Sequence, residues 1–243
     1  MSPAPDKTAD RIERMFDAIA GRYDLLNHVL SAGIDRSWRR RAIRALGLTG
    51  GERVLDLCTG TADLAIEART ASPAAAHVVG VDFSGAMLRV GRAKVINGRH
   101  DKAIVLVRGD AMRIPVADRS VDAITIAFGI RNVERPEVAC GEMYRALCPG
   151  GRLAILEFAI PTTPLVRAAY LAYFRHVLPR IGSLISRHNA AYGYLPASVA
   201  AFETPDAFVK ILGQSGFTEI SAVPLTLGIV YLYTALRASD SRE

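Results

Sequence analysis

The sequence predicts an α/β fold with one open, mostly parallel sheet, helices before it and an antiparallel hairpin at its C-terminal end. Between Arg53 and Phe158, short apolar runs alternate with helical patterns, which is typical of a parallel sheet covered by helices on both faces. After Pro205, two strand patterns follow each other with no helix between them. They must pair antiparallel, because a parallel crossover needs a longer connection.

The first part of the chain, residues 8–46, reads as two or three helices that form an N-terminal helical cap. Apolar residues, among them Ile12, Phe16 and Ile19, recur at helical spacing. Asp35 is expected to cap the helix that carries Trp38 and the following arginines.

The second part, residues 52–160, is expected to form the core of the fold. We expect strands at 53–57, 77–82, 103–110, 121–128 and 152–158. We expect helices at 61–71, 84–97 and 135–147, and a turn at 149–151. Residues 161–204 then read as an insertion that covers the substrate, and residues 205–238 as a helix followed by the hairpin. All four parts belong to one domain of 243 residues.

Charge and composition restrict the class of protein. Thirty Lys and Arg face 24 Asp and Glu, so the net charge is +6, which suits a nucleic acid or an anionic membrane surface as partner. The densest basic cluster, Ser37 to Arg44, is explained more simply as a solvated helix face. The three cysteines show no metal-ligand spacing and no disulfide framework. With no secretory signal and no apolar run that could span a bilayer, we expect a cytoplasmic protein without a metal.

The loop after the first predicted strand indicates a ligand site. Gly60 allows close approach of the backbone, and Thr61 is expected to begin a helix. The loop lacks both the dinucleotide fingerprint and the Gly-Lys-Ser/Thr ending of a phosphate loop. Asp56, Asp82 and Asp110 end three consecutive strands, which favours a ligand with a ribose and a positively charged tail. Each aspartate could instead serve as a helix cap.

Three segments resemble the S-adenosylmethionine motifs of class I methyltransferases, whose fold is Rossmann-like. They are VLDLCTGTAD (54–63), VDFSGAML (81–88) and GDAMRIP (109–115). Five more specific segments, in order, are similar to the ubiquinone/menaquinone biosynthesis C-methyltransferase family. They are MFDAIAGRYDLLNHVLSAGIDRSWRR, AFGIRNV, RALCPGGRLAILEF, AYGYLPASVAAF and LTLGIVYLY, and the likeness covers nearly the whole chain.

The resemblance implies a seven-stranded sheet that ends in the reversed hairpin, and S-adenosylmethionine as cofactor. Thr61 and Asp82 would hold the cofactor, Asp82 through the ribose hydroxyls. Asp110 and Ala111 would frame the adenine, while Asp56 and Gly60 would line the methionine end. The chain departs from the family pattern at Ala62, where many members have glycine. It also departs at Ala127, a cofactor-site position where a serine is more usual, so one hydroxyl contact should be missing.

The resemblance also implies methyl transfer to a ring carbon of a polyprenylated quinol. Demethylmenaquinol is favoured, and 2-methoxy-6-polyprenyl-1,4-benzoquinol is the alternative. Arg131 and Asn132, which follow the fourth strand, would position the quinol, with Arg131 stabilising the developing phenolate. The other role open to Arg131 is a salt bridge to Glu157 or Asp122. Tyr23, Asn27, Tyr192 and Tyr194 would close over the substrate, although tyrosines are often packing residues.

Residues 165–185 combine Arg167, Arg175 and Arg180 with apolar and aromatic side chains. This composition suits an interfacial helix, so we expect peripheral contact with the inner face of a membrane. A helix that covers the core with snorkelling arginines is equally compatible. A nucleic-acid methyltransferase is disfavoured, because FGIRN stands where an N-P-P-Y type loop would be expected; a scaffold that only binds the cofactor is a third alternative. The general base and the oligomeric state stay open.

Overall fold

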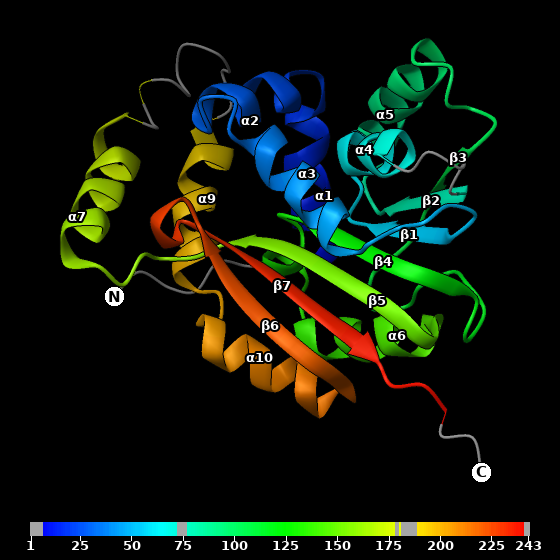
Figure 1. Cartoon of the computed structure of the whole chain (residues 1–243). Coiled ribbons are helices and arrows are strands. Elements are labelled where there is room, and N and C mark those ends of the chain that lie inside the picture. Colours follow the sequence, from blue (N-terminus) through cyan, green and yellow to red (C-terminus); the bar gives the residue numbers. More distant parts are fainter. Residues whose placement is uncertain (1–6, 72–76, 178–179, 181–188, 241–243) are drawn as a thin grey trace.

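The computed structural model describes residues 7–71, 77–177, 180 and 189–240. Its centre is one seven-stranded sheet with the strand order β3-β2-β1-β4-β5-β7-β6 (Figure 1). The strands are β1 (Arg53–Leu57), β2 (His77–Asp82), β3 (Ile104–Arg108), β4 (Val121–Ala127), β5 (Leu147–Phe158), β6 (Phe217–Leu225) and β7 (Val230–Arg237). β1 to β5 pair in parallel, and β7 pairs antiparallel with both β5 and β6. The predicted sheet and its reversed hairpin are therefore confirmed.

Helices cover both faces of this sheet (Figure 1). They are α1 (Ala9–Ile19), α2 (Tyr23–Leu30), α3 (Asp35–Ala45), α4 (Asp63–Ala71), α5 (Gly85–Asn97), α6 (Pro136–Ala146), α7 (Pro164–Ala172), α9 (Asn189–Ala200) and α10 (Pro205–Gln214). On one face, α6 and α10 bury Met143 and Phe208 against the strands. On the other, α3 and α4 bury Trp38 and Leu64. The alternating apolar runs thus supply two cores, because a strand buried on both faces is apolar at nearly every position.

Three predictions of local structure are wrong: the cap at Asp35, the start of the helix at Thr61 and the turn at 149–151. In each case side-chain contacts or strand register decide the local structure. Asp35 is the first residue of α3 and does not cap it; its buried carboxylate accepts from Ser31 Oγ at 2.8 Å and pairs with Arg39. α4 begins at Asp63, so Thr61 lies in the preceding turn. Residues 149–151 are not a separate turn. They lie within β5, where the pairing with β4 shifts register and Gly150 takes a φ of 77°.

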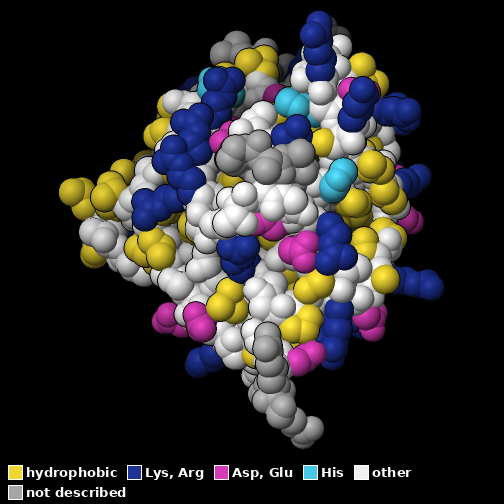
Figure 2. Space-filling view, turned by 45° about the vertical axis from the view of Figure 1, so that its right-hand side comes forward, with side chains coloured by type: hydrophobic (Ala, Val, Ile, Leu, Met, Phe, Trp, Pro, Cys, Tyr) yellow, Lys and Arg dark blue, Asp and Glu magenta, His cyan; other side chains and the backbone are white. Residues whose placement is uncertain are grey.

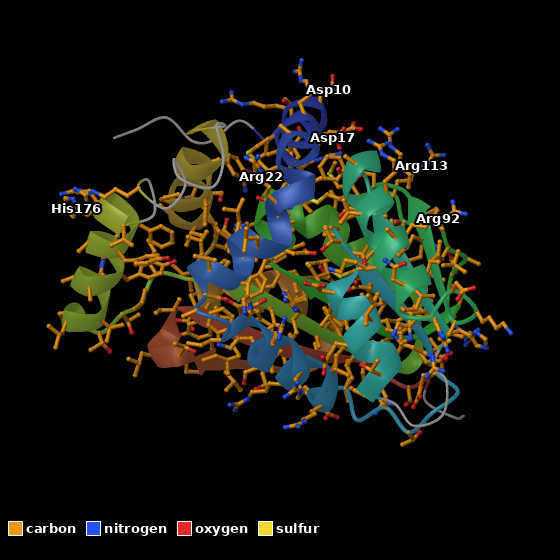
Figure 3. The ribbon with its side chains drawn as sticks, turned by 90° about the horizontal axis from the view of Figure 1, so that it is seen from above. Asp10, Asp17, Arg22, Arg92, Arg113 and His176 are labelled. Atoms are coloured by element: carbon orange, nitrogen blue, oxygen red, sulfur yellow. The ribbon has the colours of Figure 1, made fainter. Side chains whose placement is uncertain are left out.

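Acidic side chains tie the N-terminal helices to the core. Glu13 pairs with Arg108, the last residue of β3, and Asp17 accepts from the hydroxyl of Ser84, the cap of α5. Lys94 of α5 pairs with Asp24 of α2 at 2.8 Å. Figure 3 shows α1, with Asp17 labelled, lying beside α5. These contacts hold the cap over the carboxyl ends of the strands.

Gly129, between β4 and the short helix η2 (Ile130–Asn132), has no room for a side chain. A Cβ there would lie 2.3 Å from Cys58 Cβ. We expect Gly129→Ala to lower the free energy of unfolding by about 1–3 kcal/mol, because the loop after β1 would have to move. Gly141, inside α6, has nothing within 4 Å of such a Cβ. The control Gly141→Ala should instead gain roughly 0.5–1 kcal/mol. Equal urea midpoints for the two variants would contradict this assignment.

Candidate active site

A first cavity, of about 260 Å³, lies at the carboxyl ends of β1, β2 and β4 and beside the turn after β3. It contains seven of the residues that the sequence placed in a site: Tyr23, Gly60, Asp82, Asp110, Ala111, Ala127 and Asn132. Glu13, Cys58, Phe83, Met112, Phe128 and Glu134 also line it and were not predicted. The sequence could have placed Cys58, Phe83, Met112 and Phe128 among the site residues, because they lie within the motifs. Nothing in the sequence indicated Glu13, because it lies in α1, far along the chain from the cofactor motifs.

Asp82 is the best-placed acid in this cavity. It ends β2 and is 7% exposed. One carboxylate oxygen accepts the Gly60 N–H at 2.8 Å and the other accepts the Ser84 N–H at 2.9 Å. Burial raises the pKa of Asp82 to about 6, although these backbone hydrogen bonds favour the charged form. The side chain is therefore fixed in direction and retains lone pairs for a ligand hydroxyl.

Gly60 lines the cavity with backbone alone. Its φ of 55° lies in the left-handed region that favours glycine. A Cβ at this position would project toward Tyr23, whose ring carbon lies 3.9 Å away. Gly60 thereby leaves open a space between the β1 loop and α2.

Asp56 and Thr61 do not line the cavity and instead support its walls. Asp56 is 1% exposed, and its carboxylate accepts the hydroxyls of Thr59 at 2.5 Å and Thr125 at 2.6 Å. Thr61 donates its hydroxyl to Asp24 and lies 3.2 Å from Lys94 Nζ. The structure therefore brings Asp82, Gly60, Asp110 and Ala111 together at the cavity, and places Asp56 and Thr61 behind them.

Asn132 contributes a polar atom that has no partner among the described residues. Its side chain is 9% exposed, and Nδ2 lies 3.4 Å from the Phe128 carbonyl oxygen, which accepts. Its Oδ1 is buried and accepts no hydrogen bond there. Because buried polar atoms are nearly always paired, this acceptor is available to a hydrogen-bond donor that enters the cavity.

A second, larger cavity of about 570 Å³ lies between α2, α3, α7 and the hairpin end. Its wall is mostly apolar and aromatic, with Leu26, Trp38, Phe158, Tyr173, Phe174 and Ile229 among its members. Asn27, Arg131 and Tyr194 of the predicted substrate and catalytic residues also line it. Tyr192 lies in α9, but its side chain is outside what the structure describes.

Arg131 is buried, and it is paired while it faces this second cavity. Its guanidinium donates to Glu157 at 2.8 Å and to the Phe128 carbonyl, and it lies 5.5 Å from the centre of the Phe158 ring. Glu157 is fully buried. Asp122, the other partner considered, binds Arg53 at 2.9 Å. Arg131 therefore forms the salt bridge to Glu157 and also lines the second cavity.

The two cavities share three aromatic walls, formed by Phe16, Tyr23 and Phe128. Burial raises the pKa of Tyr23, and a hydrogen bond with Asn27 opposes this shift. Phe128 holds a φ of 60°, a strained backbone position, and lines both cavities. A cavity with acidic side chains in its wall therefore adjoins a more apolar cavity, and the three aromatic rings form the partition that separates them.

Comparison with solved structures identifies the class of fold. It aligns with a SAM-dependent methyltransferase from Aquifex aeolicus with a TM-score of 0.60 at 17% identity, covering 82% of this chain and 89% of that one. It also aligns with the [4+2]-cyclase SpnF with a TM-score of 0.69 at 14% identity, covering 99% and 100%. The fold is that of class I S-adenosylmethionine-dependent methyltransferases.

Sequence comparison identifies the particular family. The model of the ubiE/COQ5 methyltransferase family matches residues 5–237. The ubiquinone/menaquinone biosynthesis C-methyltransferase UbiE of Syntrophotalea carbinolica is 50% identical over 92% of this chain and 93% of its own length. The demethylmenaquinone methyltransferase of Deinococcus radiodurans is 44% identical over 95% of both chains. The chain belongs to the ubiE/COQ5 family and is an S-adenosylmethionine-dependent C-methyltransferase.

The first cavity fits this cofactor. Four carboxylates, from Glu13, Asp82, Asp110 and Glu134, line it beside two cations, Lys7 and Arg108, and this excess of negative charge suits a ligand with hydroxyl groups and positive charge. The unpartnered Oδ1 of Asn132 offers a further acceptor. Within the described residues, no cluster of His, Cys, Asp or Glu could hold a metal ion, and no helix is long and apolar enough to cross a membrane.

Proposed function

We propose that the enzyme methylates a ring carbon of a polyprenylated quinol, with demethylmenaquinol as the acceptor. The observation that carries this proposal is the apolar cavity of about 570 Å³ that adjoins the acid-lined one. An apolar cavity of this size suits a fused aromatic ring and the first units of a prenyl tail. The Deinococcus radiodurans relative is named for demethylmenaquinone, which favours that acceptor over the methoxy-polyprenyl-benzoquinol.

In this proposal, Asp82 binds the ribose hydroxyls, while Gly60 leaves room for the methionine end of the cofactor. Asp110 and Ala111 flank the adenine, because they lie in the turn after β3 at the cavity wall. Ala127 presents only a methyl group there, as expected from the missing serine. Asp56 and Thr61 act indirectly, Asp56 by fixing Thr59 and Thr61 by tying the loop to Asp24. S-adenosylmethionine supplies an electrophilic methyl group when bound.

The residues at the partition prepare the quinol for this chemistry. A quinol carbon becomes strongly nucleophilic when the neighbouring hydroxyl loses its proton. The Arg131 guanidinium would stabilise the phenolate, with the hydrogen bonds to Glu157 and Phe128 fixing its position. Tyr23, which lines both cavities, and Asn27 on α2 would orient the ring, while Asn132 on the same short helix as Arg131 would act from the first cavity. Holding reactants in line supplies roughly 7–11 kcal/mol of barrier reduction.

The cofactor affinity should depend on pH through Asp82. Its pKa is raised to about 6 by burial, so it loses its charge, and with it acceptor strength, as pH falls through 6. The affinity for S-adenosylmethionine should therefore be about 10-fold weaker at pH 5 than at pH 7. Calorimetric titrations across this range measure it. Asp82→Asn should give a flat profile, and an equally steep profile in that variant would assign the proton to another group.

The stability of the ligand-free enzyme should change in the opposite direction. Burial raises the pKa values of both Asp56 and Asp82 to about 6, above the value of about 3.9 in an unfolded chain. Their contribution to stability is fully present below about pH 4 and is lost as pH rises through 6. Urea unfolding of wild type against Asp56→Asn should show the variant gaining relative stability between pH 4 and pH 7.

We also propose peripheral contact with an anionic membrane surface at the mouth of the second cavity. Leu165 of α7 and Leu227 of η4 (Thr226–Gly228) line that cavity and are 81% and 75% exposed. Arg167 and Arg175 are exposed on α7 and the π-helical turn η3 (Tyr173–Val177) that follows it. Figure 2 shows a row of Lys and Arg side chains across one face, with hydrophobic side chains at its edge. Exposed apolar residues flanked by arginines suit lipid tails and headgroups.

Sedimentation with vesicles containing phosphatidylserine tests this contact. At low salt, wild type should sediment with the vesicles, and Leu165→Asp/Leu227→Asp should stay in solution. The control Ile96→Asp/Val105→Asp changes two apolar residues that are 53% and 58% exposed on α5 and β3, far along the sheet from α7. Equal sedimentation of both variants would refute the assigned surface.

The decisive assay for the substrate uses labelled S-adenosylmethionine with two reduced acceptors, a demethylmenaquinol and a methoxy-polyprenyl-benzoquinol. Label in the naphthoquinol supports the proposed acceptor, and label only in the benzoquinol assigns the alternative. No transfer to either, with cofactor binding confirmed and membranes supplied, would refute the quinol proposal. A nucleic-acid acceptor, tested in the same assay, should remain unlabelled.

A further inference from the structure

Tyr170 is the inward-facing residue of a helix that is otherwise largely exposed. Its side chain is 7% exposed, while Leu165 and Leu171 of the same helix α7 are 81% and 46% exposed. It lines the second cavity and packs edge-on against Phe174, with ring centres 4.4 Å apart. α7 lies at the outer edge of the molecule (Figure 1), and Tyr170 is its buried contribution to the cavity wall.

The hydroxyl of Tyr170 is buried and has no hydrogen-bond partner among the described residues. The neighbouring Tyr173 lines the same cavity, but it donates its hydroxyl to the Leu30 carbonyl at 3.1 Å. A buried phenol without a partner destabilises the protein, because it loses its hydrogen bonds to water and gains none. Such a group is retained more readily where a ligand supplies the partner.

The charges around Tyr170 suit donation to a ligand oxygen. Burial raises the pKa of Tyr170, the Arg131 guanidinium opposes the shift, and Glu157 adds to it. The phenol therefore keeps its proton at neutral pH and is a donor. Arg131 comes from η2 beside the sheet and Tyr170 from α7, so the two donors reach the same cavity from different walls. A ring with oxygens on opposite edges matches this arrangement.

We propose that the Tyr170 hydroxyl donates a hydrogen bond to one ring oxygen of the quinol, across the cavity from Arg131. This inference rests on the proposed function and names a further substrate-binding residue for it. It also makes α7 a specificity element, because the hydroxyl selects an aromatic ring that carries oxygen over a hydrocarbon of the same shape.

The only tryptophan of the chain, Trp38, lines the same cavity and reports binding directly. Its fluorescence would be followed during titration with a short-chain prenylated naphthoquinone, and separately with the prenylated naphthalene that lacks both oxygens. Tyr170→Phe should weaken naphthoquinone binding about 3–10-fold and change naphthalene binding less than about 2-fold. In the ligand-free protein, its urea midpoint should not fall, because no partner is lost.

Tyr173→Phe is the matched control. It removes a hydroxyl that has a protein partner, so its urea midpoint should fall while the ratio of the two affinities stays at the wild-type value. The inference is overturned if Tyr170→Phe lowers the urea midpoint and leaves that ratio unchanged. In turnover, Tyr170→Phe should raise the KM for the quinol with little change in the KM for S-adenosylmethionine. If wild type methylates neither quinol, the proposed function fails, whereas an active wild type with an unaltered Tyr170→Phe refutes only this inference.

Discussion

Replacing Asp82 with asparagine should raise the dissociation constant for S-adenosylmethionine by about 100-fold, because hydrogen bonds to charged groups contribute roughly 1.5–3 kcal/mol each. Both Asp82 oxygens accept backbone N–H groups, from Gly60 and Ser84. In the asparagine variant, the side-chain NH2 would face the backbone N–H of either Gly60 or Ser84, so that two hydrogen-bond donors would meet without an acceptor. The variant therefore loses an acceptor for the ligand and also disturbs the loop that leaves room for it.

Isothermal titration calorimetry measures this change, and circular dichroism confirms that the variant is folded. Asp101→Asn is the control, because it removes the same charge from an exposed turn that does not line the cavity. A dissociation constant within about 3-fold of wild type in folded Asp82→Asn would remove Asp82 from the cofactor site.

Arg131→Met should lower the free energy of unfolding by about 3–5 kcal/mol, because it leaves the fully buried Glu157 without its partner. Combining it with Glu157→Gln should restore a large part of that loss, since no buried charge then remains unpaired. Activity should stay low in both variants, about 10²–10³-fold below wild type, because the positive charge beside the quinol is missing.

The exposed pair Arg53–Asp122 supplies the control, since its side chains are 53% and 33% exposed. Arg53→Met should cost no more than about 1 kcal/mol, as is usual for ion pairs near the surface. If Arg131→Met were as stable as Arg53→Met, the buried Arg131–Glu157 pair would not contribute the stability assigned to it. Full activity in the rescued double variant would exclude the proposed role of Arg131 with the quinol.

The relatives show that the fold does not fix the reaction. The cyclase SpnF aligns over nearly the whole chain, yet its name describes a cycloaddition. The fold alone therefore does not set the substrate, and we expect the substrate to depend on the second cavity, which is lined by residues of α2, α7 and the hairpin end. Predictions about substrate must accordingly be tested at residues of that cavity, such as Arg131 and Tyr170.

Asp56 and Asp82 show how far the sequence could resolve the site. Both are aspartates near the end of a predicted strand, so the sequence pattern placed both of them in the ligand site. In the sheet, Asp56 lies opposite Gly80 and Thr125, inside the ladder, where it accepts the Thr125 hydroxyl. Asp82 is the last residue of β2 and faces the cavity. The difference depends on strand register, which is a property of paired strands and not of either strand by itself.

The sequence by itself determined the order of strands and helices along the chain, the reversed hairpin and the acids near the carboxyl ends of the strands, because these depend on local periodicity and on motifs. Only the tertiary structure decided that Glu13 lines the first cavity, that Arg131 pairs with Glu157 and not with Asp122, and that the Tyr170 hydroxyl has no partner among the described residues. Those facts arise from contacts between segments far apart in the chain. Such contacts are set by packing and by burial of charge, which no local pattern encodes.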